Sequence, residues 1–114
     1  MPGASRVPFE AAQVVTVFRS RLRADDDPEY RSVADEIEAA ARKATGFVDF
    51  KSFVADDGER VSVATFASEA AQRAWRNDVR HIEVQRRGRA EFYSRYSIQV
   101  GACVYAADWV RPGH

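Results

Sequence analysis

The stretch from residue 75 to residue 81 brings together the side chains best suited to act on a small aromatic molecule. Trp75 offers a flat indole with an N–H donor, Asn77 a carboxamide and His81 an imidazole. Because imidazole ionises near neutral pH, a neutral His81 can accept the proton of a phenol or quinol. We therefore predict His81 and Trp75 as catalytic residues and Asn77 as a substrate contact. The alternative is structural: an indole lining the core, an imidazole bridging polar groups and an asparagine ending a helix.

Four further side chains are candidates for the wall of the same pocket. Phe66 and Tyr93 supply aromatic rings, Tyr96 a second phenol, and Arg89 a guanidinium that could hold a substrate oxygen. Because successive side chains of a strand point to opposite faces, Tyr93 and Tyr96 are expected to diverge, so that one of them lines the cavity. The alternatives are a phenol buried in the core and a surface salt bridge for Arg89.

The N-terminal half predicts a strand followed by an amphipathic helix. Residues 14–22 are rich in β-branched and aromatic side chains, which favour a strand. Asp27 and Pro28 are typical of an N-cap and a first helical residue. Apolar side chains then recur every three or four residues, and Gly46 is predicted to end the helix as a left-handed cap.

The rest of the chain predicts a hairpin, two short helices and a long final strand. Residues 47–55 and 59–66 flank Asp56-Asp57-Gly58, a hairpin signal. Ser68 caps a short helix, and a second helix runs from Asn77-Asp78 to about Gly88. The last strand could reach from Ser94 to Trp109, which is longer than most strands.

Composition narrows the class of protein. The chain has 114 residues, 17 basic and 17 acidic side chains and a single cysteine, Cys103. The balanced charge predicts no nucleic-acid or membrane partner, and the lone cysteine predicts a reducing compartment, so we expect a cytoplasmic protein. No cysteine–histidine spacing is typical of a metal site, so no metal ligand is predicted.

The order strand, helix, strand, strand, helix pair, strand predicts an α+β fold. Two right-handed βαβ units joined by a hairpin give a ferredoxin-like, four-stranded antiparallel sheet with its helices on one face. Residues 1–12 are expected to be a flexible tail, and residues 13–111 a single domain. Since the predicted strands carry apolar groups on both faces, we expect a homodimer that covers the second face and forms a dimeric α+β barrel.

Several short motifs occur in this order on the predicted elements. They are Val14-Val15-Thr16-Val17-Phe18, Gly46-Phe47-Val48-Asp49-Phe50, Ala74-Trp75-Arg76-Asn77-Asp78 with His81, Gly88-Arg89, Phe92-Tyr93 and Tyr96-Ser97-Ile98-Gln99-Val100. Over residues 13 to 109 the chain resembles the antibiotic biosynthesis monooxygenase domain family, of dimeric α+β barrel fold. The resemblance implies a cofactor-independent monooxygenase that acts on a small aromatic, quinol or polyketide-type substrate, with no cofactor.

Two other functions are compatible with this resemblance. One is a non-catalytic dimeric module that binds a small hydrophobic metabolite. The other is a relative of the haem-degrading branch, which uses an asparagine on the first strand together with a tryptophan and a helix histidine. The first strand here offers Thr16, Arg19 and Ser20 instead, and His81 follows Trp75 by only six residues, which disfavours haem degradation.

Overall fold

The computed structural model describes residues 9–24 and 27–113, and within that range it describes every side chain except those at 79–81. The elements follow in the order β1 (Val14–Leu22), α1 (Pro28–Lys43), β2 (Phe47–Val54), β3 (Arg60–Phe66), α2 (Glu69–Arg76), α3 (Val79–Arg87), a π-helical turn η1 (Gly88–Phe92) and β4 (Tyr93–Ala102). The predicted tail over residues 1–12 falls mostly outside the described residues.

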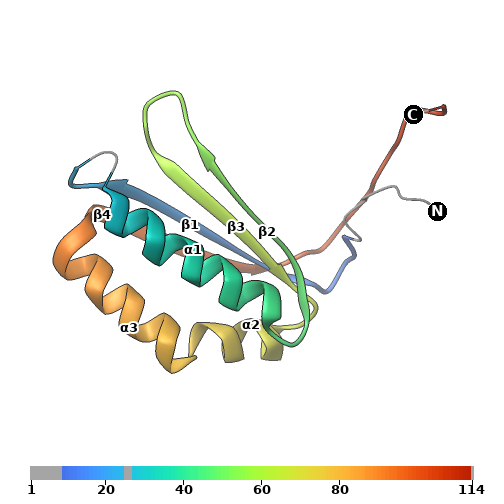
Figure 1. Ribbon diagram of the computed structural model, residues 1–114. Helices are drawn as coiled ribbons and strands as arrows, with labels where there is room; N and C mark the ends of the chain where they lie inside the picture. The colour runs from blue at the N-terminus through green and yellow to red at the C-terminus, as the bar shows by residue number, and fades with distance from the viewer. Residues whose placement is uncertain (1–8, 25–26, 114) are drawn as a thin grey trace.

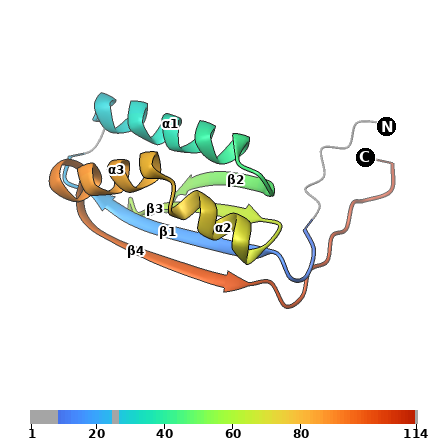
Figure 2. The same cartoon turned by 90° about the horizontal axis from the view of Figure 1, so that it is seen from below.

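The four strands form one antiparallel sheet with the order β2-β3-β1-β4. The three α-helices all lie on the same side of this sheet, as Figures 1 and 2 show. This is the ferredoxin-like arrangement, so the predicted fold class is confirmed. The opposite face of the sheet carries no helix in the part of the chain that the structure describes.

Helix α1 begins at the predicted cap. The Asp27 carboxylate accepts hydrogen bonds from the backbone N–H of Glu29 at 2.9 Å and of Tyr30 at 3.4 Å, which satisfies two of the free donors of the first turn. The helix ends at Lys43, earlier than predicted, because Ala44 is already extended. Gly46 does adopt a positive φ of 80°, but in the turn that leads into β2 and not as the helix cap.

The core lies between α1, α2 and the central strands. Ala41, Phe50, Ala64, Phe66 and Trp75 form one cluster of buried apolar side chains. The register pairs Phe50 with Ala64, and directly paired residues of antiparallel strands point to the same face. This face is therefore the one covered by the helices.

The structure differs from the prediction at the C-terminal strand. β4 ends at Ala102, and the last ladder-like hydrogen bonds join Cys103 N to Gln13 O and Ala12 N to Cys103 O, each at 2.8 Å. The chain just before β1 forms a turn at residues 11–12, where Ala12 has a φ of 78°, and residues 104–113 continue away from the sheet without strand structure (Figure 1). Val104 and Trp109 remain 91% and 71% exposed.

Candidate functional site

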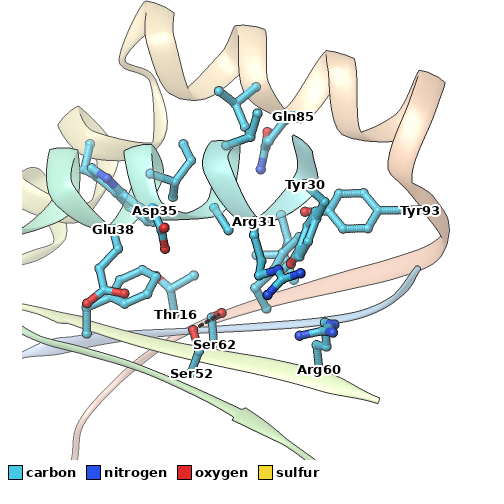
Figure 3. A pocket seen from close by; sticks show the side chains of 18 of the residues that line it. Thr16, Tyr30, Arg31, Asp35, Glu38, Ser52, Arg60, Ser62, Gln85 and Tyr93 are labelled. Carbon is cyan, nitrogen blue, oxygen red and sulfur yellow. Dashed lines mark hydrogen bonds between the residues drawn. The ribbon is translucent and has the colours of Figure 1, made fainter. Parts of the chain in front are cut away.

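A cavity of about 380 Å³ separates the helices from the sheet. Its volume lies within the range of small-molecule pockets. In Figure 3 the sheet forms the floor, and the helices form the roof. The side chains that line it include Thr16, Tyr30, Arg31, Phe50, Arg60, Gln72, Trp75 and Tyr93.

An aromatic wall forms the inner end of the cavity. Trp75, on the last turn of α2, is 9% exposed and lies tilted against the Phe66 ring, with the two centroids 5.1 Å apart. Phe66 is fully buried and also meets Phe47 edge to face. Trp75 and Phe50 line the cavity, whereas Phe66 lies behind Trp75 and supports the orientation of its ring.

A second aromatic group closes the other end. The rings of Tyr30 and Tyr93 meet edge to face with centroids 5.9 Å apart, and Tyr93 also contacts Phe18 at 5.6 Å. The Tyr93 ring can take this position because residue 88 is glycine: a Cβ at Gly88 would lie 2.5 Å from the Tyr93 ring. Burial, and then the neighbouring Tyr30 phenol, raise the pKa of Tyr93 above its usual value. Its hydroxyl therefore stays protonated at neutral pH and cannot serve as a base.

A buried amide and hydroxyl face the cavity beside the Trp75 wall, because Gln72 lies on the same face of α2 as Trp75. Gln72 is 1% exposed, and its Nε2 donates to Thr16 Oγ1 at 3.0 Å. No described residue donates a hydrogen bond to the other amide atom, Gln72 Oε1. A buried acceptor without a donor carries a free-energy cost, which a hydroxyl group of a bound ligand can remove.

The sequence reasoning did not find the pair of Gln72 and Thr16. A signal was present, since Gln72 precedes Trp75 by three residues and therefore shares its helix face. Thr16 lies in the middle of an apolar strand, where a hydroxyl needs a partner. Only the packing of α2 on β1 shows that the two groups meet.

Tyr93 and Tyr96 do not point to opposite faces, so that prediction is wrong. The register of β1 and β4 shifts between Arg21 and Leu22, which pairs Leu22 with Tyr93 but Arg21 with Arg95. This bulge turns both phenol rings to the same side, where their centroids lie 5.6 Å apart and Tyr96 stacks on Phe18 at 5.4 Å.

Three other predicted site residues, Asn77, Arg89 and Tyr96, lie outside the lining of the cavity. Asn77 is an exposed residue that ends α2, with its backbone N–H bound to Arg73 O at 2.9 Å. Arg89 donates from Nη1 to the Tyr96 hydroxyl at 3.1 Å. The backbone of His81 lies in α3, and its side chain is outside the described part of the chain.

The described residues contain no group of three or more histidine, cysteine, aspartate or glutamate side chains that could hold a metal ion. Among the same residues, no helix is both long and apolar enough to cross a membrane.

Comparison with known proteins places this fold. No protein-family model matches the chain. The chain is 26% identical over 84 residues to YqjZ of Bacillus subtilis, an uncharacterized protein, and the match covers 74% of each. The structure is similar to SnoaB, a cofactor-independent oxygenase from Streptomyces nogalater, with a TM-score of 0.68, 20% identity and coverage of 90% of this chain and 99% of SnoaB.

A Nitrosomonas europaea protein named provisionally as an antibiotic biosynthesis monooxygenase is also similar in structure. Its TM-score is 0.72 at 10% identity, and the match covers 88% of this chain and 98% of that protein. The resemblance expected from the short motifs is therefore confirmed at the level of the fold. At these identities the likeness carries the backbone arrangement alone.

Proposed function

We propose that the protein is a cofactor-independent monooxygenase that acts on a small aromatic, quinol or polyketide-type substrate. The observation that carries the proposal is the cavity itself, whose aromatic walls at Trp75, Phe50 and Tyr93 enclose the buried acceptor Gln72 Oε1. Such a space can stack a flat ring and accept its hydroxyl proton in a hydrogen bond. The similarity of fold to SnoaB, a cofactor-independent oxygenase, supports the same reaction class.

The proposed reaction requires the protein to supply a base and to bind and orient the substrate. A base removes a proton from a phenol, and the electron-rich ring carbon of the anion reduces dioxygen and forms a carbon–oxygen bond. In the keto form of the substrate, one CH₂ group and one O₂ become one C=O group and one water. His81 is the proposed base, Trp75 the stacking wall, and Gln72 the group that orients the hydroxyl.

The site functions in a homodimer in this proposal. The register directs Val15, Val17, Val61 and Val63 away from Phe50 and Ala64, onto the face that no described helix covers. All four valines are partly exposed in the single chain. A second copy laid against this face would remove them from water.

Oxygen uptake tests the proposed reaction. With 1-naphthol we expect uptake of one O₂ per molecule of naphthoquinone, retention of one ¹⁸O atom from ¹⁸O₂ in the quinone, and no release of O₂ on addition of catalase. Replacement of the general base in His81→Ala should lower kcat about 100-fold. Trp75→Phe should raise KM, and Arg86→Gln, an exposed change outside the cavity, should leave both constants unchanged.

The same assay separates the alternatives. Tight binding of naphthol without turnover would identify a binding module in place of an enzyme. A Soret band on addition of hemin would support the haem-binding alternative. Turnover that is equal in the wild type, His81→Ala and Trp75→Phe would remove both catalytic assignments.

A further inference from the structure

Two arginines lie at one end of the cavity. Arg31 comes from α1, and Arg60 is the first residue of β3. Figure 3 shows both beside Tyr30, whereas Asp35 and Glu38 lie toward the opposite end. Among the described residues, neither Arg31 nor Arg60 forms an ion pair. By contrast, six other arginines do so: Arg19, Arg21, Arg42, Arg73, Arg86 and Arg87.

Arg60 is held in place without being neutralised. Its guanidinium carbon lies 5.7 Å from the centroid of the Tyr30 ring, in a cation–π contact, and Tyr30 in turn packs against Tyr93. The aromatic ring orients the guanidinium but leaves its N–H donors available. A positive group of fixed position at the rim of a cavity is suited to bind an anion.

The middle of the floor, between Arg60 and Thr16, adds a further donor. Ser52 Oγ and Ser62 Oγ lie 2.8 Å apart, so one hydroxyl donates to the other. The second hydroxyl proton stays available to a ligand. Hydrogen-bond donors therefore come from Arg31 on the helix and Arg60 at the strand end, and the serine pair adds one in the middle of the floor.

The opposite end of the cavity offers an acceptor instead. Gln72 is bound to Thr16, which pairs with Ala64, and Arg60 lies four residues before Ala64 on the same strand. Four residues of an antiparallel strand span about 14 Å. The cavity thus has an acceptor at one end and donors at the other, at a separation that suits two or three fused rings.

We propose that the cavity is built for an aromatic acid, with a phenolic hydroxyl at Gln72 and a carboxylate at Arg31 and Arg60. This inference rests on the proposed function, because it assigns the substrate class of the same site. Asp35 lies one helical turn from Arg31 and opposes the positive charge. Glu38 is already paired with Arg42 at 2.9 Å, so among the described residues that line the cavity two arginines outweigh one unpaired carboxylate.

Binding of a matched pair of ligands tests the assignment. The probes are 6-hydroxy-2-naphthoic acid and its methyl ester, titrated calorimetrically into the full chain near neutral pH at low salt. We expect the acid to bind about tenfold more tightly than the ester. Arg31→Gln and Arg60→Gln should each weaken the acid about fivefold and leave the ester within about twofold, since Arg31 is exposed and Arg60 is partly exposed to solvent.

Arg86→Gln is the matched control, because it removes the same charge from α3 outside the cavity and should leave the binding of both probes unchanged. Arg31→Gln guards against a folding effect of Arg60→Gln, since Arg31 makes no ring contact among the described residues. Equal affinity for acid and ester would overturn the proposed anion site, and so would an equal loss of affinity for both probes in the two variants. Neither result would contradict the proposal that the cavity binds aromatic rings. Failure of the protein to bind either probe would overturn both proposals.

Discussion

At the scale of single residues, the cavity is an apolar space in which a few polar atoms can accept or donate hydrogen bonds. Gln72 presents an acceptor, and Tyr93 presents a phenol that burial keeps protonated. The sequence led to Trp75 and Tyr93 because aromatic rings near a helix end and at a strand start are natural pocket walls. It did not lead to Gln72 or Arg60, whose places depend on which elements pack together.

The raised pKa of Tyr93 predicts a loss of stability at alkaline pH. The folded chain keeps the phenol protonated above the pKa of the unfolded chain, about 10, so stability is intact below that pH and falls as the pH rises further. Urea unfolding of the wild type at about pH 8 and about pH 11 should show this fall. Tyr93→Phe should reduce it.

Tyr105→Phe is the control for this experiment, because Tyr105 is 78% exposed. Its alkaline loss of stability should equal that of the wild type. A Tyr93→Phe variant with the full wild-type loss would show that another group causes the pH dependence.

At the scale of elements, glycines and irregular turns bring the site together. The π-helical turn η1 and the bulge after it direct both tyrosines toward Phe18. Gly46 allows similarly close packing at the other end of the sheet. It has a φ of 80°, and a Cβ there would lie 2.6 Å from Ala71 Cβ on α2, which supports Gln72 and Trp75.

Replacement of Gly46 should therefore cost more than replacement of Gly58. Both have a positive φ, but nothing lies within 4 Å of a Cβ at Gly58. Gly58→Ala should lower the free energy of unfolding by about 1 kcal/mol, for the backbone conformation alone. Gly46→Ala should cost about 1–3 kcal/mol more, because Ala71 is overpacked.

Urea unfolding of the two variants measures the difference. The double variant Gly46→Ala/Ala71→Gly removes the colliding methyl group and should regain most of the extra loss. If Gly46→Ala and Gly58→Ala cost the same, close packing of α2 against this turn is refuted.

At the scale of the whole molecule, the sheet has one face covered by helices and one that is not. Val17 and Val63 pair directly on the uncovered face, and Val104 and Trp109 extend beyond the last strand. Such apolar surface is typical of an interface between chains. The proposed homodimer follows from this surface.

Multi-angle light scattering at micromolar concentration should give twice the mass of one chain. Val17→Glu places a charge on the uncovered face and should shift the mass to that of a single chain while the fold is retained, as judged by circular dichroism. Ile82→Glu is the control, because this 50% exposed residue lies on α3 on the helical side of the molecule. Its mass should stay at that of two chains, and a monomeric wild type would contradict the proposal.

The sequence by itself determined the element order and hence the fold. Caps, turn residues and periodicity act over a few neighbouring positions, as at Asp27 and Ser68, so they can be read without tertiary information. The order of two βαβ units then left few topologies. Local patterns gave the wrong end for the last strand, because that end depends on distant backbone: β4 stops at Ala102, opposite the turn at residues 11–12 that precedes β1.

Only the tertiary structure decided which polar groups share the cavity. Gln72 and Thr16 are 56 positions apart in the chain, and they meet because α2 packs over β1. Arg31 and Arg60 likewise come from a helix and a strand that are separated in the chain by β2. Local sequence patterns determine the conformation of a single segment, whereas a binding site depends on how distant segments pack against one another.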